Sequence, residues 1–356
     1  MKKRIIGLDI LRVIGVLFIF CYHFTVDYLF RGNGTMPSMT TLNYFFEVMA
    51  RPASLFLFVI SGYALMYNRE NEIPLKQYYF KRFKGLYIPF YIAWTLMTLL
   101  YFFVNNGLIT SFVKPYKLIY TILGVDGLFF QTEANFYLVG EWFMSCIVIC
   151  YALFPLLALV LKKCKYIGLV VLLAISIVML FFYNPFEKIN VAMNPLFIMV
   201  YFYIGMLLHE TIGDKKISGP VRIACLCITI ICWGYNLVSG YMPQTFPRLP
   251  GTWAEVVFAV WALAMIIGLR DAELNPEKRT YAIVAYISKI SWCVILVHHA
   301  LMGLFFSTRD ITNYTGKELF VAFVMFVLLS WAGAELVIKL SAKVNGFLFS
   351  KKTNAK

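Results

Sequence analysis

Long apolar runs separated by short polar segments form the dominant pattern along this 356-residue chain. At a rise of about 1.5 Å per residue, a helix of about 20 residues crosses the ~30 Å hydrocarbon core of a bilayer. We expect ten such spans, at about residues 8–30, 44–67, 86–104, 137–160, 166–183, 191–209, 221–239, 252–269, 287–306 and 318–338. The pattern therefore predicts an all-α, polytopic membrane helix bundle.

One further apolar run, at residues 118–130, is too short to span a bilayer and carries Asp126. It predicts a re-entrant or interfacial segment. The other polar stretches are short, so we expect a single integral membrane domain over residues 1–356, with no appended soluble domain. The composition agrees, because 61% of the residues are hydrophobic and 14% are charged, whereas soluble domains have about half and about a quarter.

Lys and Arg concentrate in every second loop between the expected spans. By the positive-inside rule, this asymmetry predicts that those loops and both termini lie in the cytoplasm. The net charge of +14 is explained by the same loops meeting anionic lipid headgroups. We therefore expect membrane lipids, and no nucleic acid, as partners of the basic surface.

The first span carries an arginine and a histidine, Arg12 and His23, eleven positions apart. At about 100° per residue both lie on one helix face, separated by roughly 16 Å along the axis. Ionisable groups inside a bilayer are costly and usually mark a pathway or a reaction site. Asp9 lies three residues before Arg12 and can pair with it. His23 suits a general base, and the alternative is a packing histidine bonded to a neighbouring helix.

The second span carries a charged pair and a small-residue pair. Glu47 and Arg51 are one turn apart and are expected to neutralise each other. Ser61 and Gly62 predict a close approach of this helix to a neighbour.

A basic and aromatic segment at residues 78–89 precedes the third span, and it includes Lys81, Arg82, Lys84 and Tyr87. One interpretation is anchoring to lipid headgroups at the inner membrane edge. The other is capture of a polyanionic nucleotide such as coenzyme A, in which cations meet phosphates and an aromatic ring stacks on the base. The residues alone favour anchoring, because every loop expected on the inner side is basic, and they leave nucleotide capture open.

Further candidate polar groups lie in later spans. Glu141 opens the fourth span beside Trp142, where its carboxylate fits either a functional group or a solvated group favoured by the helix dipole. His298 and His299 are adjacent in the ninth span. Because adjacent residues point about 100° apart, we expect only one of them to face the bundle interior.

Six runs of residues, in this order and on this topology, resemble the acyltransferase 3 family of membrane acyltransferases over nearly the whole chain. They are Leu8-Asp9-Ile-Leu-Arg12 with His23, Phe58-Val-Ile-Ser61-Gly62-Tyr63, Lys81-Arg82-Phe-Lys84 leading to Tyr87-Ile-Pro89, Trp142-Phe143-Met144 through Phe154-Pro155, Phe202-Tyr-Ile-Gly205-Met206, and Ile290-Ser291 to Leu296-Val297-His298. Some relatives have His-Leu before the tryptophan, where this chain has Gly140-Glu141.

The resemblance implies O-acyl transfer, usually of acetyl, from a cytoplasmic acyl-CoA to a hydroxyl of a cell-surface or lipid-linked glycan at the outer face. It implies a multi-pass protein of the bacterial plasma membrane, with acetyl-CoA as donor and no metal. His23 would act as base or acyl carrier. The candidate catalytic residues are His23, Arg12 and Glu141. The candidate donor-binding residues are Lys81, Arg82, Lys84, Tyr87 and Arg12. The candidate acceptor-binding residues are Glu47, Arg51, Trp142 and His298.

Two other classes of function fit parts of the pattern. A proton-coupled secondary transporter of a small anion would use the intramembrane Arg12, Arg51 and His23. Secondary transporters typically have spans interrupted by Gly or Pro at corresponding positions of two repeated halves, and such spans are not evident in the sequence. A non-enzymatic membrane scaffold fits the apolar spans but gives the intramembrane Arg12 and His23 no role.

Overall fold

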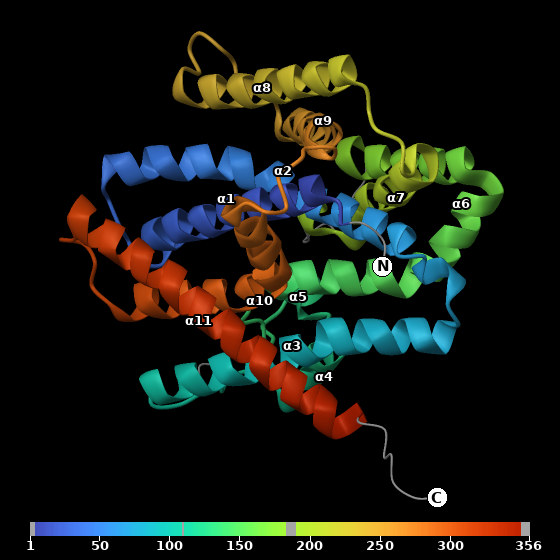
Figure 1. Ribbon diagram of the computed structural model, residues 1–356. Coiled ribbons are helices and arrows are strands. Elements are labelled where there is room, and N and C mark those ends of the chain that lie inside the picture. The colour runs from blue at the N-terminus through green and yellow to red at the C-terminus, as the bar shows by residue number, and fades with distance from the viewer. Residues whose placement is uncertain (1–3, 109, 183–189, 350–356) are drawn as a thin grey trace, which may run out of the picture.

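The computed structural model describes residues 4–108, 110–182 and 190–349, and all regular secondary structure in those residues is helical (Figure 1). The described residues contain nine helices long and apolar enough to span a membrane. These are α1 (Ile6–Phe30), α2 (Pro37–Tyr67), α3 (Leu75–Val104), α6 (Glu141–Phe181), α7 (Pro195–Ile212), α8 (Gly219–Tyr241), α9 (Gly251–Leu269), α10 (Arg279–Thr308) and α11 (Gly316–Phe349). The prediction of a polytopic membrane helix bundle is therefore confirmed.

The count of long helices differs from the ten expected spans because α6 contains two of them. It covers the runs predicted at 137–160 and 166–183, and Cys164 between them has non-helical angles, with φ −151° and ψ 52°. Figure 1 shows the ribbon of α6 turning sharply between its two halves. The lysines at 162, 163 and 165 predicted a loop. In the structure, distortion at one residue is enough to redirect the chain.

Short helices fill the connections. They are η1 (Glu70–Glu72), η2 (Pro115–Lys117), α4 (Leu118–Leu123), α5 (Asp126–Phe129) and η3 (Val191–Met193). The apolar run at 118–130 thus forms α4 and α5, and neither is long enough to span a bilayer. A Cβ on Gly127 of α5 would lie 2.2 Å from the Cα of Trp142, so α5 packs directly on the first turn of α6.

The centre of the bundle is built on α2, which packs against both α1 and α7, while α1 also packs against α10. The close approach predicted at Gly62 is present. A Cβ there would lie 2.0 Å from the carbonyl oxygen of Phe202 on α7, closer than any real contact allows. At the margin, α8 packs on α9 and lies at the top of Figure 1. The central contact of α1 with α10 positions the site described next.

Candidate functional site

Arg12 is held at the start of α1 by a carboxylate and a hydroxyl. Its Nη1 donates to Ser288 Oγ of α10 at 2.9 Å and lies 3.4 Å from Asp9 Oδ1. Ser288 Oγ donates to the same Asp9 oxygen at 2.5 Å, and Arg4 Nε lies 2.5 Å from the other. The predicted pairing of Asp9 with Arg12 is therefore confirmed. The structure adds Ser288 as the link between α1 and α10.

A cavity of about 420 Å³ opens beside Arg12 and is enclosed by α1, α2, α3, α6 and α10. Its cations are Arg12, Lys81, Arg82 and Lys289. Hydroxyl groups of the wall include those of Ser61 and Ser288. The remaining wall is largely apolar and aromatic, and it is formed by Leu57, Leu86, Phe143, Ile147, Tyr151, Trp292 and Ile295. The cavity therefore joins a basic wall to an apolar one, as expected for a ligand with an anionic head and a less polar arm.

Of the predicted donor-binding residues, Lys81, Arg82 and Arg12 line this cavity, whereas Lys84 and Tyr87 do not. The Lys84 ammonium lies over the rings of Phe80, at 4.3 Å, and Phe349, at 4.1 Å. The Tyr87 hydroxyl donates to the carbonyl of Leu123 at 2.8 Å. Because successive helical residues turn by about 100°, a contiguous basic run cannot present all its side chains to one cavity.

A buried carboxylate, Glu70, organises the basic wall. Lys81 and Arg82 both pair with the same oxygen of Glu70, and the Arg82 contact measures 3.2 Å. The Arg82 guanidinium also lies 5.7 Å from the centre of the Tyr151 ring. These contacts hold two flexible cations in place, while one acidic charge offsets only part of their positive charge.

His23 lies against both histidines of α10. The centre of its ring is 5.1 Å from that of His298 and 4.9 Å from that of His299. The expectation that only one of the pair would face the interior was wrong. An imidazole on α1 that projects between two adjacent positions of α10 reaches both of them. His299 was not among the predicted site residues, although its position next to His298 was the signal that could have identified it.

The cavity and this group of histidines lie along the same two helices. On α10 the cavity wall runs from Ser288 to Ile295, and His298 follows Ile295 by less than one turn. On α1, Arg12 marks the cavity and His23 lies roughly 16 Å further along the axis. The basic cavity and the group of histidines therefore occupy successive stretches of α1 and α10.

Glu141 is fully buried at the first position of α6 rather than solvated. Its carboxylate accepts the backbone N–H groups of Leu138 and Val139, each at 2.9 Å. The adjoining Gly140 has φ +79°, and a Cβ there would lie 4.0 Å from the Cβ of His299. Glu141 thus fixes the loop that packs beside His299. Its neighbour Trp142 packs edge-on against Phe143, with ring centres 5.9 Å apart.

The predicted pairing of Glu47 with Arg51 was wrong. Arg51 forms its ion pair with Glu255, which α9 brings against α2. Glu47 is exposed one turn away from Arg51. A carboxylate two hundred residues distant in sequence displaced the local partner, because tertiary contact brings it within reach of the same guanidinium.

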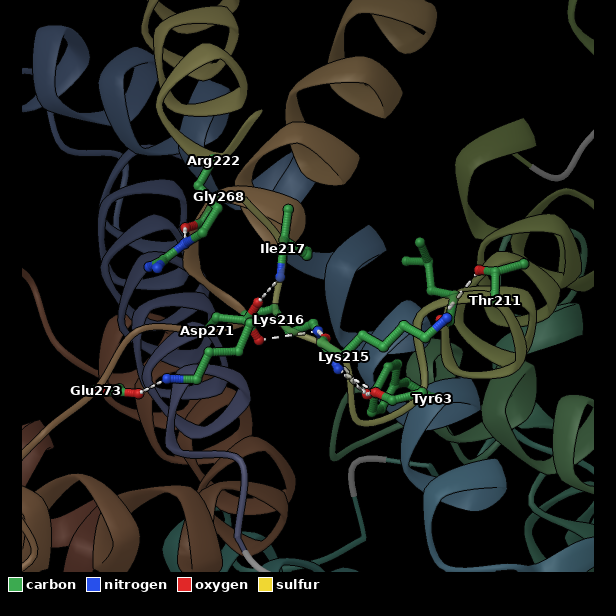
Figure 2. Close-up of polar contacts among 12 residues, drawn as sticks. Tyr63, Thr211, Lys215, Lys216, Ile217, Arg222, Gly268, Asp271 and Glu273 are labelled. Carbon is green, nitrogen blue, oxygen red and sulfur yellow. Dashed lines mark hydrogen bonds and ion pairs between the residues drawn. The ribbon is translucent and has the colours of Figure 1, made fainter. Parts of the chain in front are cut away.

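A second polar network stabilises the connections at the end of the bundle that carries Arg12. The buried Arg270 donates to the Tyr63 hydroxyl at 2.9 Å and to the Lys215 carbonyl at 2.9 Å. Asp271 accepts the backbone N–H of Ile217 at 2.6 Å, a contact drawn in Figure 2. Tyr63, which closes the Ser61-Gly62-Tyr63 run, therefore anchors the α7–α8 connection.

No group of three or more His, Cys, Asp or Glu residues in the described part of the chain has the geometry of a metal site. The fold and the site together define a multi-pass membrane protein with a basic cavity and a separate group of intramembrane histidines on the same two helices. The model of the acyltransferase domain family matches residues 5–335, a range that includes every site residue above. The chain belongs to this acyltransferase 3 family. No curated protein and no solved structure matches it.

Proposed function

We propose that this membrane acyltransferase moves an acyl group, acetyl in the simplest case, from acyl-CoA to a hydroxyl of a cell-surface or lipid-linked glycan. The observation that carries the proposal is the alignment of the basic cavity with His23 along α1 and α10. The donor enters at the basic end and the acceptor meets it at the histidines.

The cavity suits the arm of coenzyme A. Lys81, Arg82 and Lys289 supply cations for the phosphates, and charge-assisted hydrogen bonds to such cations are among the strongest available to a protein. The wall from Ser288 to Ile295 then offers a path for the pantetheine arm toward His23. A cavity of about 420 Å³ lies within the usual range for ligand pockets, about 300–1,000 Å³.

His23 acts as the general base in this proposal. One ring nitrogen takes the proton of the acceptor hydroxyl as the oxygen forms a bond to the acyl carbon. The thioester C–S bond breaks, and the departing CoA sulfur takes the proton back from His23, so charge and protons balance. In the covalent variant, His23 first attacks the acyl carbon itself, the C–S bond breaks and CoA leaves as a thiolate. The acceptor hydroxyl then displaces the acylated ring, and its proton passes to that thiolate. A site inside the bundle limits loss of the thioester to water.

The other predicted residues take supporting roles. Arg12, oriented by Asp9 and Ser288, borders the donor arm. Glu141 keeps the loop beside His299 in place. The acceptor is proposed to contact Trp142, Glu47 and Arg51. The Arg51 guanidinium also forms an ion pair with Glu255.

The proposed orientation has the Arg12 end in the cytoplasm of a bacterial cell and the histidines toward the outer face of its plasma membrane. The excess of Lys and Arg in alternate loops supports this placement, with anionic lipid headgroups as partners of the basic end.

The test uses purified protein in lipid nanodiscs, radiolabelled acetyl-CoA and a panel of glycans. We expect label to enter at least one glycan as an ester released by mild alkali, and the His23→Ala protein to give none. Lys84→Ala is the matched control, because Lys84 lies outside the cavity. If the His23→Ala protein labels the glycans as strongly as the wild-type protein does, the proposal is contradicted. Uptake of small anions without acetyl-CoA would favour transport instead.

A further inference from the structure

The ring of His298 is fixed in one tautomer by its own helix. Its Nδ1 lies 3.0 Å from the carbonyl oxygen of Val294 and 3.0 Å from that of Ile295. Carbonyl oxygens only accept hydrogen bonds, so Nδ1 must carry the proton. In the neutral ring, Nε2 is then the atom with the lone pair.

That lone pair has no partner within the described residues. Nε2 of His298 is buried and makes no hydrogen bond. A buried polar atom left unpaired costs about 1–3 kcal/mol, so in a native structure it calls for an explanation, such as strain, a catalytic role or a bound water.

The His298 ring contacts two side chains of α1, Phe20 and His23, and His23 is the polar one. Phe20, one turn before His23, stacks on His298 with ring centres 5.7 Å apart and planes 29° apart. His23 meets the ring edge-on at 5.1 Å, with planes 69° apart. Two imidazoles joined by an N–H···N bond have centres roughly 5 Å apart, given the usual donor–acceptor distance of about 2.9 Å. Phe20 packs on one face of His298, and the ring separation is close to that of a hydrogen-bonded pair. The structure forms no hydrogen bond between His23 and His298, and a small rotation of the His23 ring would make one.

We propose that His298 is the positioning residue for His23, accepting its N–H through Nε2 and thereby leaving the other nitrogen of His23 as the reactive lone pair. This role rests on the proposed function and replaces acceptor binding as the role of His298. It follows the general requirement that a histidine base be held in one orientation and one tautomer by a second group.

The first test observes the tautomer of His298 in the wild-type protein. The chain has only four histidines, so the imidazole nitrogens of protein labelled with ¹⁵N-histidine can be resolved, and single histidine substitutions assign them. We expect His298 to be protonated at Nδ1 and to show scalar coupling from Nε2 to a nitrogen of His23. A His298 protonated at Nε2 would overturn the inference even if the protein proves to be an active acyltransferase.

The second test separates positioning from packing. In His298→Asn the side-chain amide can still bond the helix carbonyls, but nothing occupies the place of Nε2. In His298→Gln an amide oxygen reaches that place and can accept the His23 N–H. We expect kcat to fall about 10–100-fold in the Asn variant, as for lost partners that orient metal-binding histidines. The KM for acetyl-CoA should stay within about twofold, and the Gln variant should recover most of kcat.

Equal loss in the Asn and Gln variants, or a loss confined to KM, would show a packing or binding role and contradict the proposal. If wild-type protein shows no acyl transfer at all, the proposed function fails, while the ¹⁵N measurement still decides the placement of the proton.

Discussion

Gly62 of α2 and Gly205 of α7 oppose each other so closely that neither position can carry a side chain. A Cβ on Gly62 would lie 2.0 Å from the carbonyl oxygen of Phe202, and a Cβ on Gly205 would lie 2.0 Å from that of Val59. The two helices meet backbone to backbone, as small residues permit in membrane bundles. This contact sets the spacing of α2, whose Leu57 and Ser61 form part of the cavity wall.

Gly62→Ala should therefore destabilise the protein. Its methyl group meets backbone, which cannot rotate away, so the helices must separate at a cost of about 1–3 kcal/mol. Thermal unfolding in detergent should show a midpoint several degrees lower. Gly234→Ala on α8 is the control, because nothing lies within 4 Å of a Cβ there. An unchanged midpoint for Gly62→Ala would refute the close contact.

Arg82→Ala should weaken binding of acetyl-CoA, whereas Lys84→Ala should not. Both residues belong to one basic run, but only Arg82 lines the cavity. Loss of a hydrogen bond to a charged group costs about 1.5–3 kcal/mol, which corresponds to a Kd raised about 10–100-fold. Calorimetric titration of both variants checks this. If Lys84→Ala weakens binding as much as Arg82→Ala, the basic run acts through general charge rather than through the cavity.

Asp126 should make stability depend on pH. It lies on α5, outside the spanning helices, and burial raises its pKa from 3.8 to about 6. The folded state holds this proton more tightly than the unfolded state does. Below pH about 4 the carboxyl is protonated in both states and does not lower the free energy of unfolding. As the pH rises to 6 and above, ionisation of Asp126 lowers the free energy of unfolding, by about 3 kcal/mol at most for a shift of this size.

Asp126→Asn removes the ionisable group and should therefore raise the unfolding midpoint above that of the wild type at pH 8. The difference should shrink toward pH 4. Paired thermal unfolding curves at pH 4, 6 and 8 measure it directly. A difference that stays constant with pH would mean that the Asp126 carboxyl does not titrate in this range.

The features predicted correctly from sequence are those set by local geometry. The length of apolar runs predicted the spans, three-residue spacing predicted the pairing of Asp9 with Arg12, and a small residue predicted the close approach at Gly62. Each depends only on helix periodicity and the requirements of a bilayer.

The features missed depend on tertiary contacts. Arg51 pairs with Glu255 because α9 packs against α2, and no local rule indicates that contact. His299 joins His23 because of where α1 crosses α10. Lys84 turns to Phe349, at the far end of the chain. In each case the sequence placed the residue on the correct helix but could not show which distant residue would face it.

The catalytic role of His23 is tested by measuring binding and turnover of acetyl-CoA by wild-type and His23→Ala proteins in the same lipid nanodiscs with one accepted glycan. We expect both proteins to bind acetyl-CoA with Kd values within about threefold, because His23 does not line the donor cavity. Release of CoA should fall at least about 100-fold in His23→Ala, since a general base contributes about 10²–10⁴-fold. A folded His23→Ala protein that releases CoA and acylates the glycan at the wild-type rate would contradict the catalytic role of His23.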